Sequence, residues 1–181
     1  MNSCEIPPCP GSQAQEQARI SEAGSRLHRL LPTEAGLAWS GVPVQEYKPT
    51  AAHHCGVRRL VLVGETGEKT AFHLRYFEIA PGGFTTLEHH RHEHVVIVLR
   101  GSGLARIADQ EHVLTYGDTL YIAPHEVHQL RNPSADEPFG FLCLVDAVRD
   151  RPIVVADNAD QASTCESSVG VGPSITPPSD L

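Results

Sequence analysis

The sequence is poor in aromatic residues and in cations and has no long apolar run, and each shortage excludes a class of protein. Only 6 % of the 181 residues are aromatic, and 14 Lys and Arg against 22 Asp and Glu give a formal net charge of −8. Non-specific nucleic-acid binding needs a basic footprint, which is missing here. The longest nearly unbroken apolar run, Val95–Leu99, is far shorter than the roughly 20 residues of a membrane-spanning helix. We therefore expect neither nucleic acid nor membrane as a partner.

The cysteines do not form a recognisable framework. They are Cys4, Cys9, Cys55, Cys143 and Cys165. This odd and scattered set matches neither a disulfide scaffold nor a zinc ribbon. Residues 1–20 also lack the apolar block of a secretory signal. We therefore expect a cytoplasmic protein, and we interpret the first two cysteines as tail thiols, since no second pair stands nearby to complete a zinc site.

Both ends of the chain are poor in residues that could build a core. Residues 1–38 are predicted to be an N-terminal extension, with a helix over Ala14–Leu31 that Pro32 ends. Residues 156–181 are rich in Ser, Pro, Gly and Thr, so we predict a disordered tail. This leaves residues 39–155 as one folded domain, a size that can bury a sizeable core.

The middle of the chain shows short apolar runs separated by Gly, Pro, Asp and Asn. The runs are Leu60–Val63, Phe72–Ile79, Val95–Leu99, Leu104–Ala108, Val113–Tyr116, Thr119–Ile122, Val127–Leu130 and Phe139–Val145. Many of their residues are β-branched or aromatic, and turn signals recur every 8–12 residues or so. The pattern predicts an all-β sandwich or barrel, with Asp109-Gln110 as a hairpin turn.

Histidines are concentrated just before the strand predicted at Val95–Leu99. They are His89, His90, His92 and His94. If that strand extends back, its period of two places three of them and Glu88 on one face, with His89 on the other. Inside a barrel, each unpaired polar group would cost about 1–3 kcal/mol, and a metal ion would remove that cost by using the lone pairs. A solvated edge strand is the alternative.

A second polar segment, Gly117–Asn132, completes a pattern that resembles the cupin superfamily. Cupin sequences follow G(X)5HXH(X)3–4E(X)6G and then G(X)5PXG(X)2H(X)3N. The first motif matches the segment from the turn Pro81-Gly82-Gly83 to Gly101, and the second matches Gly117–Asn132 with His128 and Asn132 in register. The resemblance covers about residues 75–145. It implies a single double-stranded β-helix, the small jelly-roll barrel of cupins.

The first motif departs from the family in an orderly way. Counting back from Gly101, the glutamate position holds His94, and the two histidine positions hold Glu88 and His90. The resemblance then implies that Glu88, His90, His94 and His128 hold one divalent transition metal per chain, either Fe, Mn, Zn, Ni or Cu. Alternatively, Glu88 orients a ligand imidazole from outside the coordination sphere.

The second motif also departs from the family, at two turn positions. Ala123 replaces the first proline and His125 replaces the glycine, so we expect an altered loop rather than altered ligation.

Further candidates lie around the ligand positions. We name His92, His125, Tyr121 and Arg75 as candidate catalytic residues. Strand positions that line or back the core are Arg75, Tyr76, Arg106, Tyr121, Gln129 and Cys143. An inward arginine would anchor an anionic substrate through bidentate hydrogen bonds. The alternation of the strands alone does not select one of these residues.

The resemblance implies a metal-dependent enzyme acting on a small organic molecule in the barrel, with dioxygenase favoured over isomerase or lyase. A binding or sensing module without turnover is the alternative, and a metal-stabilised barrel without a ligand is a third. A polar cavity beside His90 and His128 would favour an enzyme. Small cupins also commonly dimerise, through a sheet face or an exchanged strand such as Trp39–Tyr47, so we expect a homodimer.

Overall fold

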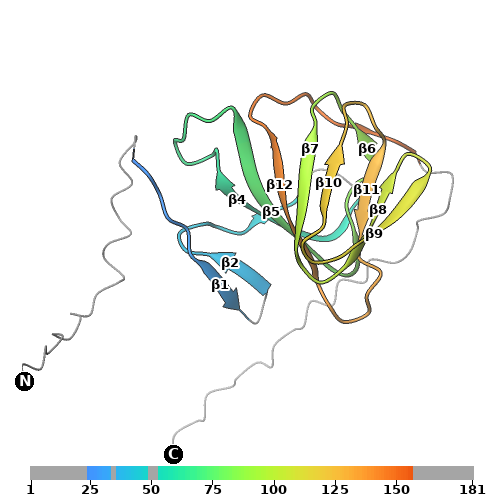
Figure 1. The fold of residues 1–181 in the computed structure, drawn as a ribbon, viewed down its shortest axis with the longest axis horizontal. Coiled ribbons are helices and arrows are strands. Elements are labelled where there is room, and N and C mark those ends of the chain that lie inside the picture. The colour runs from blue at the N-terminus through green and yellow to red at the C-terminus, as the bar shows by residue number, and fades with distance from the viewer. Residues whose placement is uncertain (1–23, 34–35, 49–52, 157–181) are drawn as a thin grey trace, which may run out of the picture.

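The described part of the chain is built of β-strands (Figure 1). The computed structural model describes residues 24–33, 36–48 and 53–156, and no helix occurs among them. The strands are β1 (Leu30–Thr33), β2 (Gly36–Trp39), β3 (Gln45–Glu46), β4 (Cys55–Val63), β5 (Phe72–Phe84), β6 (Glu88–His89), β7 (His94–Arg100), β8 (Gly103–Ile107), β9 (Gln110–Leu114), β10 (Thr119–Ile122), β11 (His128–Arg131), β12 (Phe139–Asp146) and β13 (Ile153–Val154). Over these ranges, nothing has the helical length and hydropathy needed to span a membrane.

Eleven of these strands form one curled antiparallel sheet, as the cupin resemblance implies. Its order is β10-β7-β12-β5-β11-β6-β13, with β3 and β4 joined through β5, and β8 and β9 joined through β11. Each of the eight apolar runs of the sequence overlaps one of its strands. A hairpin turn was predicted at Asp109-Gln110. It is present one residue earlier, at Ala108–Asp109, where Ala108 has a left-handed φ of 51°.

The sheet is buried on both faces along β4, β5 and β12. On β5, the side chains of Phe77 and Ile79 belong to the core inside the barrel, whereas Tyr76 belongs to a second cluster outside it. Trp39 from the N-terminal hairpin covers this outer cluster, with its ring 4.7 Å from that of Tyr76. The two-sided burial follows from strand alternation, since β5 carries large apolar residues at both parities.

The N-terminal helix is wrong for the residues that the structure describes. Residues 24–29 have no regular structure, and β1 pairs with β2 as a separate two-stranded hairpin; residues 14–23 lie outside the described residues. Leu27, Leu30 and Leu31 stay exposed, so no apolar stripe packs a helix onto the barrel, and the backbone bonds of the hairpin take its place. Cys4, Cys9, Cys165 and the predicted tail after Ala156 also lie outside the described residues.

The segment Trp39–Tyr47 is not one strand. β2 ends at Trp39, a turn follows in which Gly41 has a φ of 72°, and only Gln45–Glu46 pairs again, with β4. A left-handed turn residue breaks the extended backbone that an exchanged strand would need.

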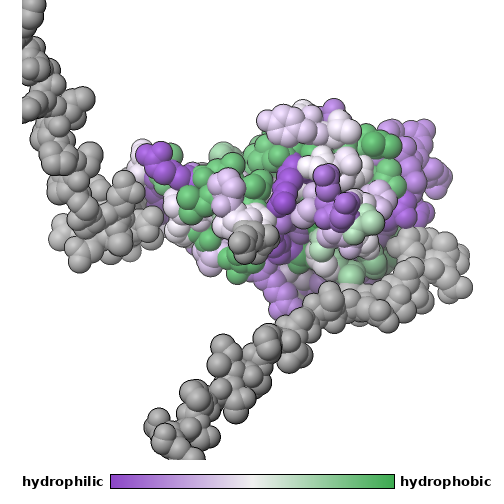
Figure 2. Space-filling view, turned by 90° about the horizontal axis from the view of Figure 1, so that it is seen from below, coloured by the Kyte–Doolittle hydropathy of each residue, from purple (hydrophilic) through white to green (hydrophobic). Residues whose placement is uncertain are grey.

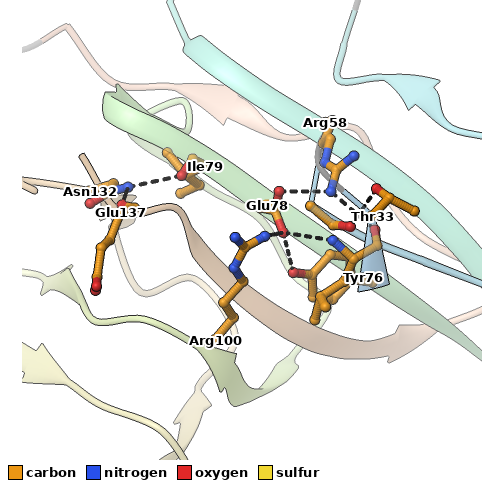
Figure 3. Close-up of polar contacts among 10 residues, drawn as sticks. Thr33, Arg58, Tyr76, Glu78, Ile79, Arg100, Asn132 and Glu137 are labelled. Carbon is orange, nitrogen blue, oxygen red and sulfur yellow. Dashed lines mark hydrogen bonds and ion pairs between the residues drawn. The ribbon is translucent and has the colours of Figure 1, made fainter. Parts of the chain in front are cut away.

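A buried carboxylate ties the hairpin to the barrel (Figure 3). Glu78 on β5 accepts hydrogen bonds from Arg58 Nη2 at 2.7 Å, Arg100 Nη1 at 3.0 Å and the Tyr76 hydroxyl at 2.7 Å. Arg58 also donates to the carbonyl of Leu37 in β2 at 3.0 Å. Burial, together with Glu78, raises the pKa of Tyr76. Glu78 thus joins three strands and the hairpin in one network.

Asn132, the last residue of the second cupin motif, has a structural role. Its buried side-chain amide donates to the carbonyls of Ile79 and Glu137 at 2.9 and 2.8 Å (Figure 3). It therefore fixes the end of β11 against β5 and the following loop. Away from this network, the face seen in Figure 2 mixes hydrophilic and hydrophobic residues.

Candidate functional site

Three histidines from three strands or strand ends converge inside the barrel. His90 follows β6, His94 begins β7 and His128 begins β11, and one nitrogen atom of each lies within 4.8 Å of the others. We call these residues the histidine trio. His90 and His128 are buried and His94 is partly buried. Such a set of convergent imidazoles could hold a transition-metal ion.

The hydrogen bonds of His90 and His128 leave their Nε2 atoms as candidate ligands. Nδ1 of His90 contacts the carbonyl of His92 at 2.7 Å, and Nδ1 of His128 contacts the carbonyl of Glu126 at 2.8 Å. Because a carbonyl only accepts, both Nδ1 atoms carry the proton, and both Nε2 atoms keep their lone pairs. This is the arrangement of metal-binding histidines, whose second nitrogen donates to a neighbouring acceptor.

Burial keeps the trio neutral. It lowers the pKa of His90 to about 4, and it lowers the pKa of His94 and of His128 as well. The neighbouring histidines add to the effect at His90 and His94, since a second positive charge there would be repelled. Imidazoles that are unprotonated at neutral pH are in the form that binds a metal ion.

The stretch from Glu88 to His94 is not the continuous strand that the alternation predicts. β6 ends at His89, and a bend at Arg91 and His92 separates it from β7. The Asp150 carboxylate holds this bend by accepting from the backbone N–H groups of Arg91 at 2.9 Å and His92 at 3.2 Å. The local contacts of the bend therefore override the period of two.

His92 lies behind the trio rather than within it. Its ring stacks on that of His90, with centroids 3.6 Å apart and planes 3° from parallel. Its Nδ1 atom contacts Asp150 Oδ1 at 2.8 Å. The His92–Asp150 pair thus supports the ring of His90 from one side.

Glu88 lies beside the trio with its charge already paired. The residue is buried on β6 opposite His128, and its carboxylate forms an ion pair with Lys48. Burial lowers the pKa of Lys48, whereas the charge of Glu88 raises it. Lys48 itself has a left-handed φ of 44°, a strained backbone for a lysine. The ion pair with Glu88 holds Lys48 in this conformation.

The polar cavity that would favour an enzyme is present. It has a volume of about 200 Å³ and includes the trio, His92, Lys48 and Glu88 in its wall. Apolar walls come from Phe77, Val96 and Phe141, and Arg59, Arg75 and Arg149 add positive charge. A small organic molecule could enter this space and reach the trio.

A thiol also faces the cavity. Cys143 on β12 is buried and free, and its Sγ atom lies 3.1 Å from Nδ1 of His94 and 3.2 Å from Nη2 of Arg75. Burial raises the pKa of this thiol, while the Arg75 guanidinium lowers it. Both neighbours could donate to a negatively charged sulfur, so the site can stabilise a thiolate when one forms.

Of the other sequence candidates, Arg75 lies in the cavity wall and Tyr121 and His125 do not. Tyr121 is exposed and its hydroxyl donates to Glu93. His125 is exposed with a φ of 67°, the left-handed conformation that the glycine of the family motif would adopt easily. Its backbone N–H donates to the carbonyl of His90 at 2.6 Å, so it positions a trio residue through the backbone.

The remaining strand candidates divide by face. Tyr76 lies in the outer cluster, Gln129 is buried and donates to the Thr85 carbonyl at 2.9 Å, and Arg106 lies outside the cavity wall. Sequence reasoning missed Lys48, Asp150, Arg59 and Arg149. The only available signal was charge. Arg59 follows Arg58 directly on β4, and the other three lie in irregular segments without a period.

Comparison with known proteins identifies the family of this chain. The family described as cupin domain matches residues 75–145. The 1-methylthio-D-xylulose 5-phosphate methylsulfurylase of Rhodospirillum rubrum is 42 % identical over 125 residues, which are 67 % of this chain and 76 % of that protein. This chain belongs to the cupin superfamily. The resemblance inferred from the two motifs is thus confirmed.

Solved structures place this cupin among small barrel proteins. A cupin-2 domain from Rhodospirillum rubrum is 39 % identical with a TM-score of 0.63, over 73 % of this chain and 86 % of that one. A cupin 2 conserved barrel domain protein from Rhodopseudomonas palustris is 36 % identical with a TM-score of 0.63, over 72 % and 87 %. The polyketide cyclase RemF of Streptomyces resistomycificus, 21 % identical with a TM-score of 0.63 over 76 % and 89 %, shares the fold alone.

Proposed function

We propose that this cupin is a metal-dependent enzyme that cleaves a carbon–sulfur bond in a methylthio-substituted ketose phosphate. The observation that carries the proposal is the Cys143 thiol, which faces the cavity between His94 and Arg75. The relative that is 42 % identical is named for such a substrate, a sugar with a methylthio group on the carbon next to its carbonyl. A thiol in the cavity suits such a substrate, because its thiolate can attack the methylthio sulfur.

The histidine trio is the proposed metal site. His90, His94 and His128 would bind a divalent transition metal through Nε2, with Glu88 paired to Lys48 at its edge. When bound, the metal supplies a Lewis acid for the substrate carbonyl. The sequence predicted four ligands, Glu88 and the three histidines. We propose the three imidazoles as the core of the site.

Cys143 is the proposed nucleophile. Its thiolate attacks the methylthio sulfur, an S–S bond forms, and the C–S bond breaks with its electron pair moving to the carbon beside the carbonyl. The resulting enolate takes up a proton and leaves as the deoxy-ketose. A small-molecule thiol then attacks the mixed disulfide, carries away the methylthio group as its own mixed disulfide and restores Cys143. Arg75 Nη2 and His94 Nδ1, at 3.2 and 3.1 Å, are placed to stabilise the thiolate in both steps.

The dioxygenase expected from the sequence is the second candidate. Three imidazoles without a bound carboxylate leave open positions on a metal ion, which suits oxygen chemistry as well. The cavity thiol and the name of the relative favour carbon–sulfur cleavage over it. A ligand-binding module without turnover is the third candidate.

The test is an assay of the purified full chain, loaded with metal, on 1-methylthio-D-xylulose 5-phosphate with dithiothreitol. We expect release of the methylthio group in wild type, loss of release in Cys143→Ser, and a methylthio adduct on Cys143 when the dithiothreitol is left out. Elemental analysis of Cys143→Ser should show wild-type metal content, because its sulfur is not among the ligand atoms. Full release by Cys143→Ser, or oxygen consumption in place of release, would overturn the proposal.

A further inference from the structure

Three arginines that are distant in sequence line one cavity. Arg59 comes from β4, Arg75 from β5, and Arg149 from the segment after β12. Their side-chain hydrogen bonds go to neutral acceptors or to sulfur. Arg59 donates to Gln45 Oε1 at 3.1 and 2.6 Å, Arg149 donates to the Asp146 carbonyl at 2.8 Å, and Arg75 contacts Cys143. Within residues 24–33, 36–48 and 53–156, none of the three forms an ion pair with a carboxylate at 4 Å or less.

The carboxylates in the cavity wall are engaged elsewhere. Glu88 is paired with Lys48, and Asp150 is held by His92 and by the backbone of the bend. The wall therefore carries three guanidinium charges that its own acids do not neutralise. A metal ion in the trio would add further positive charge on the same cavity.

Three arginines outside the cavity pair with carboxylates instead. Arg58 and Arg100 both donate to the buried carboxylate of Glu78 (Figure 3), and Arg131 pairs with Glu111 at the surface. On β4, Arg58 pairs with Glu78 outside the barrel, whereas its neighbour Arg59 lines the cavity, as strand alternation requires. The outward arginine has a carboxylate partner and the inward one has none.

The three cavity arginines are also close enough to affect one another. Burial lowers the pKa of Arg149, and the charges of Arg75 and Arg59 lower it further, while Glu65 and Cys143 oppose them. The Nε atom of Arg75 is buried without a hydrogen-bond partner. Gathering like charges and an unsatisfied donor is unfavourable in the free protein, and a bound anion would relieve both.

We infer that Arg59, Arg75 and Arg149 form the binding site for the phosphate group of the substrate. A phosphate monoester carries two negative charges and several acceptor oxygens, which planar guanidinium groups bind in bidentate fashion. The inference rests on the proposed function, and it assigns the phosphate to residues that neither motif contains. Arg75 also contacts Cys143, so the phosphate site adjoins the reacting sulfur through this one residue. A ketose phosphate bound in this way has its far end at the arginines and its methylthio end toward Cys143.

The test measures binding without turnover, by calorimetry on the full chain with D-xylulose 5-phosphate and with D-xylulose, which lack the methylthio group. We expect the phosphorylated sugar to bind at least about tenfold more tightly, and inorganic phosphate to compete with it. Arg59→Gln and Arg149→Gln should each weaken binding of D-xylulose 5-phosphate about tenfold or more. The matched control is Arg131→Gln, which removes a charge from the surface pair with Glu111 and should bind within about twofold of wild type.

The outcomes separate this inference from the proposed function. Equal binding of the two sugars, or unchanged binding in Arg149→Gln, would overturn the phosphate site even if carbon–sulfur cleavage occurs. A retained preference for the phosphorylated sugar in wild type and in Cys143→Ser, without any cleavage, would support the site and reject the reaction. Arg149 lies outside the strands, so its variant stays informative if Arg59→Gln does not fold.

Discussion

The Nε2 atoms of His90 and His94 lie 2.8 Å apart and face one another. The hydrogen bond from Nδ1 of His90 to a carbonyl leaves a lone pair on the Nε2 of His90, directed at its neighbour. Nitrogen ligands at metal–nitrogen distances of 2.0–2.1 Å lie about 3 Å from one another on a single ion. The two side chains are thus already near the separation that a shared cation would require.

Removing trio imidazoles should remove the metal. We expect the purified wild type to contain about one divalent transition metal per chain and His90→Ala/His128→Ala to contain almost none, because one imidazole cannot hold the ion alone. Elemental mass spectrometry measures the content. The control is His112→Ala, an exposed histidine on β9, which should keep the wild-type content. Equal metal in the double variant would disprove the site.

Neutralising Glu88 should leave the metal in place. Its carboxylate is paired with Lys48, so we expect Glu88→Gln to keep one metal per chain, with affinity reduced less than about tenfold, as for a group outside the coordination sphere. Competition with a chelator of known affinity measures the change. Loss of the metal would instead make Glu88 a fourth ligand, as the cupin motif implies.

Gly36 should tolerate a side chain far less well than Gly41. Both have left-handed φ values, 117° and 72°, but a Cβ atom on Gly36 would lie 2.1 Å from Arg58 Nη2 and from Glu78 Oε1, whereas one on Gly41 meets nothing within 4 Å. We expect Gly41→Ala to cost about 1 kcal/mol of unfolding free energy from backbone strain alone. Gly36→Ala should cost about 3 kcal/mol or more, because it also disrupts the Glu78 network.

Urea unfolding of the two glycine variants gives this difference directly. The φ of 117° at Gly36 lies farther than the 72° of Gly41 from the left-handed region that L residues adopt. The excess cost of Gly36→Ala therefore contains this additional backbone strain together with the crowding at the hairpin contact. Similar costs for both variants would show that the hairpin does not pack on Glu78 in solution.

His73 should make the protein less stable in mild acid. Burial lowers the pKa of His73 below 6.5, and the charges of Arg149, Arg75 and Arg59 lower it further while Glu65 opposes them. Between the folded pKa and 6.5, the unfolded chain binds more protons at this residue than the native chain does. The stability from neutral His73 is therefore complete above pH 6.5 and is lost as the pH falls.

The measurement is urea unfolding at about pH 7.5 and about pH 5.5, on either side of the ordinary histidine pKa. His73→Gln should show a smaller loss of unfolding free energy between the two than wild type. His112→Gln, which removes an exposed histidine instead, should lose as much as wild type. An unchanged loss in His73→Gln would refute the assignment.

The sequence by itself determined the strands of the barrel and most of the histidine site. The apolar runs from Leu60 to Val145 and the two cupin motifs are local patterns, and strand formation depends on such patterns. His90, His94 and His128 were identified from motif spacing, because each lies at or next to the end of a strand that the motif itself defines.

The tertiary structure alone decided which neighbouring side chains complete the site. Asp150, which is 58 residues from His92 in the sequence, holds the His92 ring behind the trio. Lys48, which is 40 residues from Glu88, pairs with its carboxylate. Arg59, Arg149 and Cys143 meet only because β4, β12 and the segment after β12 surround one cavity. Contacts over such distances depend on the packing of the whole barrel, and no local period in the chain encodes them.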